Sequence, residues 1–225
     1  MVDEYLDERE QAEQLKQWFK ENWLWMAAGV VLGLGGLYGW QGWNAHLDRK
    51  SQDAGRLFGE MLQALDQSDR ARGTEIADEI FEKYGSTPYA DQAHLVLARI
   101  HAENDELDQA ASELGTVIEQ SGDAELALVA RLRLARVQSA QGNHDAALAT
   151  LDAAAAPAIE AAVADLRGDV LVAKGDPAAA LAAYRQALAA SSPSSGDGLV
   201  DPALLQLKID ELSAASQAAP APEAP

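Results

Sequence analysis

The sequence contains no cysteine among its 225 residues. A disulfide framework and a thiolate metal site are therefore excluded, and the absence is compatible with an extracytoplasmic domain. Basic residues are also scarce, because 17 lysines and arginines stand against 36 aspartates and glutamates, for a net charge of −19. This charge argues against a nucleic acid or an anionic lipid surface as the main partner of the soluble part.

Charge is missing altogether between Glu21 and Asp48, where the chain reads NWLWMAAGVVLGLGGLYGWQGWNAHL. From Trp23 to Trp43 a helix rises about 30 Å, the thickness of a bilayer core. All five tryptophans lie at or near the two ends of this tract, as amphipathic rings at the two headgroup levels would. They are Trp18, Trp23 and Trp25 at one end and Trp40 and Trp43 at the other. We predict one transmembrane helix over residues 22–46.

Two alternatives to a membrane anchor are weaker. A buried helix of a soluble domain seldom carries indoles only at its ends. A cleaved signal peptide needs small residues at alternate positions before the cleavage site, and Trp43 would occupy such a position if cleavage followed Ala45.

Residues 1–21 form a short N-terminal tail, whose side of the membrane is weakly encoded. Arg9, Lys16 and Lys20 precede the span, and three basic residues also follow it at Arg49, Lys50 and Arg56. Lysines close to the membrane and the ease with which long C-terminal domains cross favour a cytoplasmic tail and an external domain.

The remainder, residues 47–214, shows no strand-like alternation, and its apolar residues recur at helical spacing. Turn residues divide it into helices of roughly a dozen residues, the pattern of an α-solenoid. The expected breaks are Gly73, Gly85–Pro88, Asn104–Asp105, Gly122, Gly142–Asn143, Pro157 and Gly175–Pro177. We therefore predict an all-α fold with one N-terminal transmembrane helix followed by a helical-repeat domain.

Small residues recur along this domain. Ala77, Ala110, Ala147 and Ala180 are spaced by 33, 37 and 33 residues, and a larger side chain follows each by four, at Phe81, Leu114, Leu151 and Tyr184. Ala98, Ala135 and Gly168 occupy the matching place in the preceding helices. This pattern resembles the tetratricopeptide repeat, with its period of 34 residues. A non-repetitive, alanine-rich bundle is the alternative.

The C-terminal end carries a last amphipathic segment and then a proline-rich one. Leu204, Leu205, Leu207, Ile209 and Leu212 predict a helix that caps the open end of the repeats. Residues 215–225 have little to bury and predict a disordered tail, and residues 191–198 predict a loop.

The whole layout resembles one family. The segments STPYADQAHLVLA and LRLARVQSAQGNHDAALATL, behind one uncleaved span, are similar to the YfgM-type ancillary subunits of the bacterial Sec translocon. This resemblance implies an inner-membrane protein with a periplasmic repeat domain. It also implies three kinds of partner: SecYEG, a membrane-anchored chaperone of the PpiD type, and unfolded or newly translocated proteins. A general membrane-tethered adaptor for envelope assembly or cell division remains the alternative.

No motif predicts an enzyme, a cofactor or a metal site. His94 and His101 are seven residues apart in one expected helix, but two histidines without a third ligand make a poor metal site, and we expect solvated or groove-lining side chains. A nucleophile elbow, a phosphate-binding glycine loop and a zinc signature are all missing. A binding function is the better interpretation.

Two sets of residues are candidates for binding. Gly29, Gly33 and Gly36 form a small-residue stripe, beside a second pair at Gly35 and Gly39, and such stripes let membrane helices approach closely. Arg99 and Arg136 occupy the same repeat position in neighbouring first helices, which line the concave surface of a stack. We expect them to lie side by side and to hold a partner's carboxylate, although each could instead balance nearby surface carboxylates.

Overall fold

The structure is a computed structural model, and it describes residues 2–191 and 200–218. The chain consists of two compact parts, Met1–Asp53 and Ala54–Pro225, which we call the N-terminal part and the repeat domain. The predicted loop at 191–198 lies outside the described residues except for Ser191.

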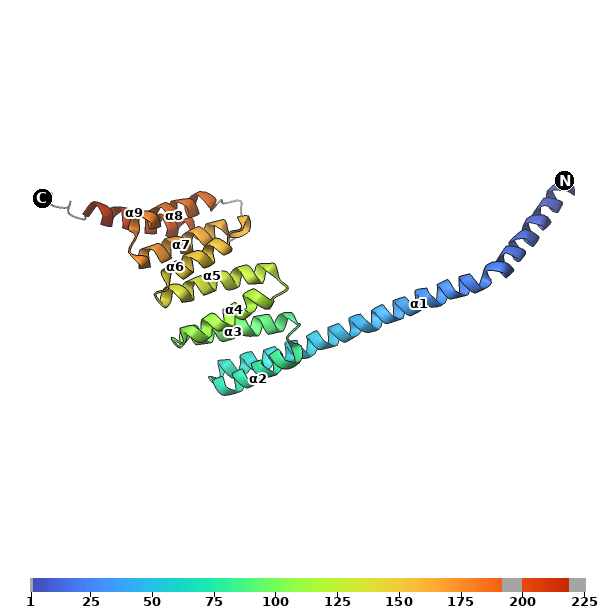
Figure 1. Cartoon of the computed structure of the whole chain (residues 1–225), viewed down its shortest axis with the longest axis horizontal. Helices are drawn as coiled ribbons and strands as arrows, with labels where there is room; N and C mark the ends of the chain where they lie inside the picture. Colours follow the sequence, from blue (N-terminus) through green and yellow to red (C-terminus); the bar gives the residue numbers. More distant parts are fainter. Residues whose placement is uncertain (1, 192–199, 219–225) are drawn as a thin grey trace. The chain divides into compact units, whose positions relative to one another are not determined.

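The described residues form helices and contain no strand (Figure 1). The helices are α1 (Val2–Asp66), α2 (Arg70–Tyr84), α3 (Pro88–Glu103), α4 (Leu107–Gln120), α5 (Ala124–Ala140), α6 (His144–Ala153), the 3₁₀ turn η1 (Pro157–Ile159), α7 (Glu160–Lys174), α8 (Pro177–Ala190) and α9 (Pro202–Ala218). The predicted all-α fold is therefore confirmed.

Helix α1 contains the expected tail, the expected span and the beginning of the domain expected at residue 47. Its last stretch, residues 54–66, belongs to the repeat domain and buries Ala54, Leu57, Met61 and Ala64. The sequence between Asp48 and Asp66 contains no proline and no glycine pair, so nothing in it interrupts the helix.

Four turns of the repeat domain share one conformation. Ser68, Asp105, Gly142 and Gly175 all have positive φ, at 63°, 61°, 80° and 85°. In each turn the next residue donates its N–H to a carbonyl five residues earlier, for example Asp69 to Ala64 and Asp176 to Leu171. These bonds satisfy carbonyls that the end of a helix leaves free. The turns mark four helix pairs: α1 (54–66) with α2, α3 with α4, α5 with α6, and α7 with α8.

This register corrects the sequence-based one in the first pair. The four turns are 37, 37 and 33 residues apart, and counting five residues on from each reaches Gly73, Ala110, Ala147 and Ala180, all buried. Gly73 is therefore not a break, because it lies inside α2 and takes the place of the small residue. Ala77, which we had placed there, occupies the position of the larger side chain, and Phe81 lies one turn further on.

The two helices of each pair meet through side chains of complementary size, sixteen residues apart. The four pairs of residues are Met61 and Ala77, Ala98 and Leu114, Ala135 and Leu151, and Gly168 and Tyr184. All eight are buried. In each pair one residue is large and the other small, so the space at the crossing is filled. The larger one lies on the first helix at Met61 and on the second helix in the other three pairs.

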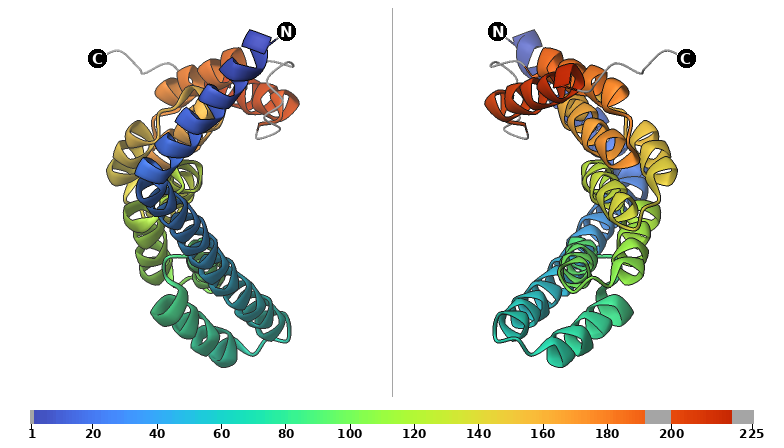
Figure 2. Two further views of the ribbon diagram at one scale, coloured as in Figure 1. Left: turned by 90° about the vertical axis from the view of Figure 1, so that its right-hand side faces the viewer. Right: turned by 90° about the vertical axis from the view of Figure 1, so that its left-hand side faces the viewer.

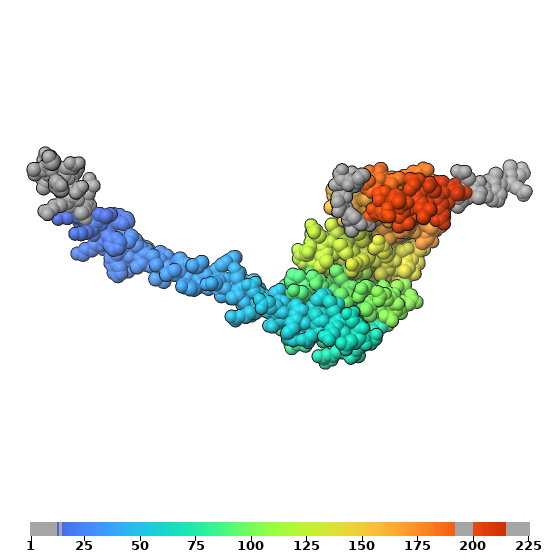
Figure 3. Space-filling view, turned by 180° about the vertical axis from the view of Figure 1, so that it is seen from behind, coloured from blue at the N-terminus to red at the C-terminus, as the bar shows by residue number. Residues whose placement is uncertain are grey.

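The core is a row of four clusters, and each is shared by three successive helices. The cluster around Ile80 joins α1, α2 and α3, and the one around Val117 joins α3, α4 and α5. Those around Leu151 and Tyr184 continue to α7 and α9. The repeat domain is accordingly a curved row of helices, whose colours follow one another in sequence order over its surface (Figures 2 and 3). Such packing in sequence order is typical of helical-repeat proteins.

The last helix, α9, covers the end of this row as predicted, but with fewer of its apolar residues. Leu205 and Ile209 are buried, whereas Leu204 and Leu207 are exposed. The backbone stays helical to Ala218, beyond the expected start of a disordered tail at residue 215. Residues 219–225 lie outside the described part of the chain.

Candidate partner-binding surfaces

Helix α1 is the one described helix that is long and apolar enough to cross a membrane, in the stretch Leu15–Asp66. None of the side chains of its charge-free tract is buried, and Trp23, Trp25, Trp40 and Trp43 are exposed. An apolar surface of this extent is costly in water, and it suits a lipid environment or another apolar surface.

The glycine stripe is open along this tract. A Cβ atom built on Gly29, Gly33 or Gly36 would meet nothing within 4 Å, and the same holds for Gly35 and Gly39. The protein's own chain therefore does not use the space that these glycines leave. A contact with another membrane helix stays a prediction for all of them.

The two arginines of the expected groove, Arg99 and Arg136, are both exposed. Arg99 lies 3.8 Å from Glu103, one turn further along α3. Arg136, on α5, makes no ion pair with any residue that the structure describes within 4.0 Å. Both keep their charged groups available to solvent and to a partner.

The same repeat position in α7 is Asp169, and its surroundings are very different. Lys208 of α9 donates to Asp169 at 2.7 Å and to Asp165 at 2.8 Å, and Tyr184 donates its hydroxyl to Asp169 at 2.7 Å. Burial lowers the pKa of Lys208, but the two carboxylates outweigh that effect and leave the pKa above its ordinary value. Burial raises the pKa of Tyr184, and its bond to Asp169 adds to the rise. The capping helix therefore occupies this end of the row.

The histidines of α3 contradict our expectation of solvated or groove-lining side chains. His94 is stacked on Phe81, with ring centroids 3.8 Å apart, and its Nδ1 lies 2.5 Å from a carboxylate oxygen of Glu113. His101 lies 2.6 Å from Glu106. Both side chains are partly buried between helices. In the described part of the chain, no three residues of metal-ligand type are grouped.

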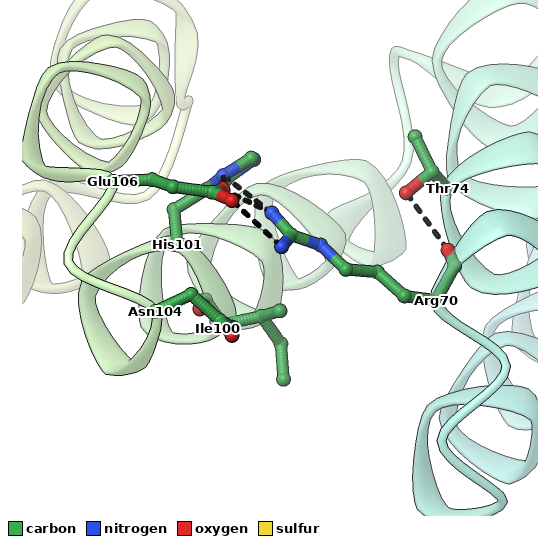
Figure 4. Close-up of polar contacts among 6 residues, drawn as sticks. All are labelled: Arg70, Thr74, Ile100, His101, Asn104 and Glu106. Carbon is green, nitrogen blue, oxygen red and sulfur yellow. Dashed lines mark hydrogen bonds and ion pairs between the residues drawn. The ribbon is translucent and has the colours of Figure 1, made fainter.

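His101 belongs to a polar cluster that joins the first two helix pairs (Figure 4). Arg70, at the start of α2, donates to both carboxylate oxygens of Glu106, one of them at 2.8 Å, and its other contact is His101 Nδ1 at 3.0 Å. The hydrogen bonds from Arg70, and then that with His101, lower the pKa of Glu106 to about 2. The cluster holds neighbouring pairs together at the edge formed by the turns.

Later pairs are joined by two contacts that are equivalent to each other. Gln141 donates to Asp108 at 2.7 Å, and Lys174 donates to Asp145 at 2.6 Å. Asp108 and Asp145 are 37 residues apart, and Gln141 and Lys174 are 33 apart, so each contact repeats the other one pair further on. These residues were not singled out from sequence, although the repeat spacing could have found them.

Comparison with known proteins relates the chain to one domain family and to several named relatives. Residues 16–214 match the tetratricopeptide repeat-like domain family. The ancillary SecYEG translocon subunit of Escherichia coli is 35% identical over 212 residues, which cover 93% of this chain and 98% of that protein. The subunit of the same name from Haemophilus influenzae is 32% identical over 182 residues, 81% of this chain and 89% of that protein.

The chain belongs to the family of ancillary SecYEG translocon subunits. The match to the tetratricopeptide repeat-like domain begins at residue 16, so it includes the apolar tract as well as the repeats. The suspected family is thus confirmed. In this chain, each of the four turns with positive φ separates the two helices of one repeat.

Proposed function

We propose that this protein is a non-enzymatic adaptor of the Sec translocon, anchored in the inner membrane by the apolar tract of α1. The observation that carries the proposal is the family: relatives named ancillary SecYEG translocon subunit are aligned over most of their own length, up to 98%. One exposed apolar helix in front of a helical-repeat domain fits such a role.

The anchor spans residues 22–46, with residues 1–21 in the cytoplasm and the repeat domain in the periplasm. Lys16 and Lys20 next to the apolar tract support this orientation. In the membrane, the stripe of Gly29, Gly33 and Gly36 packs against a helix of SecYEG or of another membrane partner, because glycines let two backbones approach closely.

In the periplasm, the repeat domain holds a membrane-anchored chaperone of the PpiD type close to the translocon and to newly translocated proteins. Arg99 and Arg136, exposed at equivalent positions of α3 and α5, form a row that binds a carboxylate-bearing surface of such a partner. Planar guanidinium groups suit this, since each can donate two hydrogen bonds to one carboxylate.

Crosslinking in intact membranes tests the proposal. A photo-reactive residue in the anchor or on α5 is expected to capture SecYEG and chaperone subunits respectively. Capture of division or outer-membrane assembly factors alone would favour a general membrane-tethered adaptor instead.

Orientation is tested separately. A reporter that is active only outside the cytoplasm, fused after Pro225, should be active, and protease added to spheroplasts should degrade the repeat domain. Protection from the protease would overturn the compartment and the periplasmic partners together.

A further inference from the structure

A cavity of about 410 Å3 opens between α7, α8 and the segment that joins α6 to α7. Five of its lining residues are small or apolar, namely Ala155, Ala156, Pro157, Val163 and Ala164. Three longer side chains, Glu160, Arg167 and Gln186, line the remainder. The volume lies within the range of about 300–1,000 Å3 that is usual for ligand sites in proteins.

The repeat register explains why this space is empty. Ala155 occupies the position of Phe81, Ile118 and Leu188 in the other three helix pairs. Those three large side chains are partly buried and pack against the core, whereas Ala155 is exposed. The helix before it, α6, has 10 residues where its counterparts α4 and α8 have 14. The third pair therefore lacks one turn of helix and one large apolar side chain.

The charges around the cavity are unequal. Arg167 is paired with Asp152 at 2.7 Å, so its charge is balanced. Glu160 receives only an amide hydrogen bond, from Gln186 at 3.4 Å, and forms no ion pair with a described residue. Removing the 5 basic and 8 acidic residues of the first fifty leaves 12 lysines and arginines against 28 aspartates and glutamates in the rest of the chain. The site therefore combines an apolar lining with one carboxylate, Glu160, that no described cation balances, in a part of the chain that is acidic overall.

We propose that this cavity binds one large apolar side chain of an extended polypeptide in which a lysine or arginine is the neighbouring residue. The apolar side chain takes the space that Phe81, Ile118 and Leu188 fill in the other pairs, and the basic one approaches Glu160. A second copy of the chain is a poor occupant, because it carries the same large negative charge. The inference rests on the proposed role near newly translocated chains, and it names the kind of segment that the domain takes.

The test uses the full chain in nanodiscs of uncharged lipid and a fluorescent dodecapeptide of glycine and serine with a central Phe-Lys. Fluorescence anisotropy is expected to show binding that weakens at least about tenfold when Phe is replaced by Ala. Replacing the peptide's lysine by glutamate should weaken binding several-fold at low salt and much less at high salt, where exposed charges are screened.

Two variants locate the site. Ala155→Leu fills the cavity with a side chain that an equivalent position already carries, and should weaken peptide binding at least about tenfold. Ala149→Leu, at an exposed position of α6 outside the cavity lining, is the matched control and should leave binding unchanged. Glu160→Gln should keep the preference for Phe and remove most of the preference for lysine over glutamate.

Undiminished binding by a folded Ala155→Leu chain would overturn the proposal, as would equal losses in both alanine variants. Failure of the parent chain to bind the Phe-Lys peptide would overturn it too. Co-purification of SecYEG from membranes is measured on the same variants and should not change. Loss of peptide binding with intact co-purification supports the cavity, whereas a parent chain that binds the peptide but no translocon refutes the proposed function alone.

Discussion

Gly168 in the repeat domain and the glycines of the apolar tract in the N-terminal part have opposite surroundings. A Cβ on Gly29, Gly33 or Gly36 of the membrane tract would meet nothing within 4 Å, whereas one on Gly168 of α7 would lie 2.3 Å from the ring of Tyr184. At Gly168 the space beside the glycine is already filled by the same chain. Along the apolar tract of α1 that space is open, so glycine serves folding at Gly168 and is available to a partner in the tract.

The largest effect on stability is expected at Gly168, where the space beside the glycine is filled by Tyr184. Gly168→Ala forces a methyl group into the ring of Tyr184, and backbone on one side and a buried ring on the other leave little room to adjust. We expect the free energy of unfolding to fall by about 3 kcal/mol, at the upper end of what overpacking costs. Urea denaturation of the full chain in detergent, followed by circular dichroism, measures it.

A second substitution makes this test specific. Tyr184→Leu together with Gly168→Ala creates the alanine–leucine pair that already occurs at Ala98 with Leu114 and at Ala135 with Leu151. The double variant should recover most of the lost stability, although it also loses the hydroxyl bond to Asp169. Simple addition of the two single losses would mean that size complementarity does not govern the crossing.

The open glycines should behave in the opposite way. Gly29→Leu with Gly33→Leu leaves the isolated chain folded and inserted, since leucine is more apolar than glycine. Co-purification of the membrane partner should nevertheless fall several-fold, because the larger side chains separate the two helices. Val30→Leu, on an exposed face of the helix away from both glycine pairs, is the control. Full association of the glycine variant, or of a chain with an unrelated apolar span, would contradict the predicted contact.

Sequence reasoning succeeded where a residue's role is local or periodic. The charge-free tract and the family were evident from sequence, and Ala110, Ala147 and Ala180 gave the register of three helix pairs. It failed at Gly73, because glycine is both a helix breaker and the smallest residue for a helix crossing. The turn is made instead by Ser68, whose positive φ is uncommon for a residue other than glycine.

The binding surfaces were less accessible to sequence reasoning. Arg99 and Arg136 follow from the repeat, but the fate of the next equivalent residue, Asp169, depends on Lys208, which is 39 residues away. Likewise, the contact of Arg70 with Glu106 spans 36 residues. The repeat pattern does not predict such contacts, because each joins two helices through residues that are not repeated in the other helix pairs.

A smaller effect on stability is expected at the charged side chain of Glu106. Glu106 is held by Arg70 and His101, which lower its pKa to about 2 from an ordinary value of 4.5. A lowered carboxyl pKa stabilises the fold above the unfolded value, and that stabilisation is lost as the pH falls from about 4.5 toward about 2. The denaturation midpoints of the parent chain and Glu106→Gln should therefore differ most near pH 6, draw together below about pH 4.5 and converge near pH 2. A gap that stays constant across this range would show that the carboxylate charge is not what stabilises the contact.

The smallest effect on stability is expected at the two exposed arginines. Like the glycines of the apolar tract, they are open to a partner and make few contacts within the chain. Arg99 has only Glu103 at 3.8 Å as an ion-pair partner, and such exposed pairs contribute about 0–1 kcal/mol. Arg99→Glu with Arg136→Glu should therefore leave helical content and Tm almost unchanged. Binding of a partner's soluble domain should weaken at the same time, because two guanidinium groups become carboxylates in a domain that is already strongly acidic. Lys83→Glu with Arg185→Glu reverses two other exposed cations of the repeat domain and is the matched control, because it changes the net charge by the same amount. Unchanged binding by a folded Arg99→Glu, Arg136→Glu variant would assign both arginines to the balance of surface charge. An equal loss with the control variant would assign the effect to total charge rather than to the row.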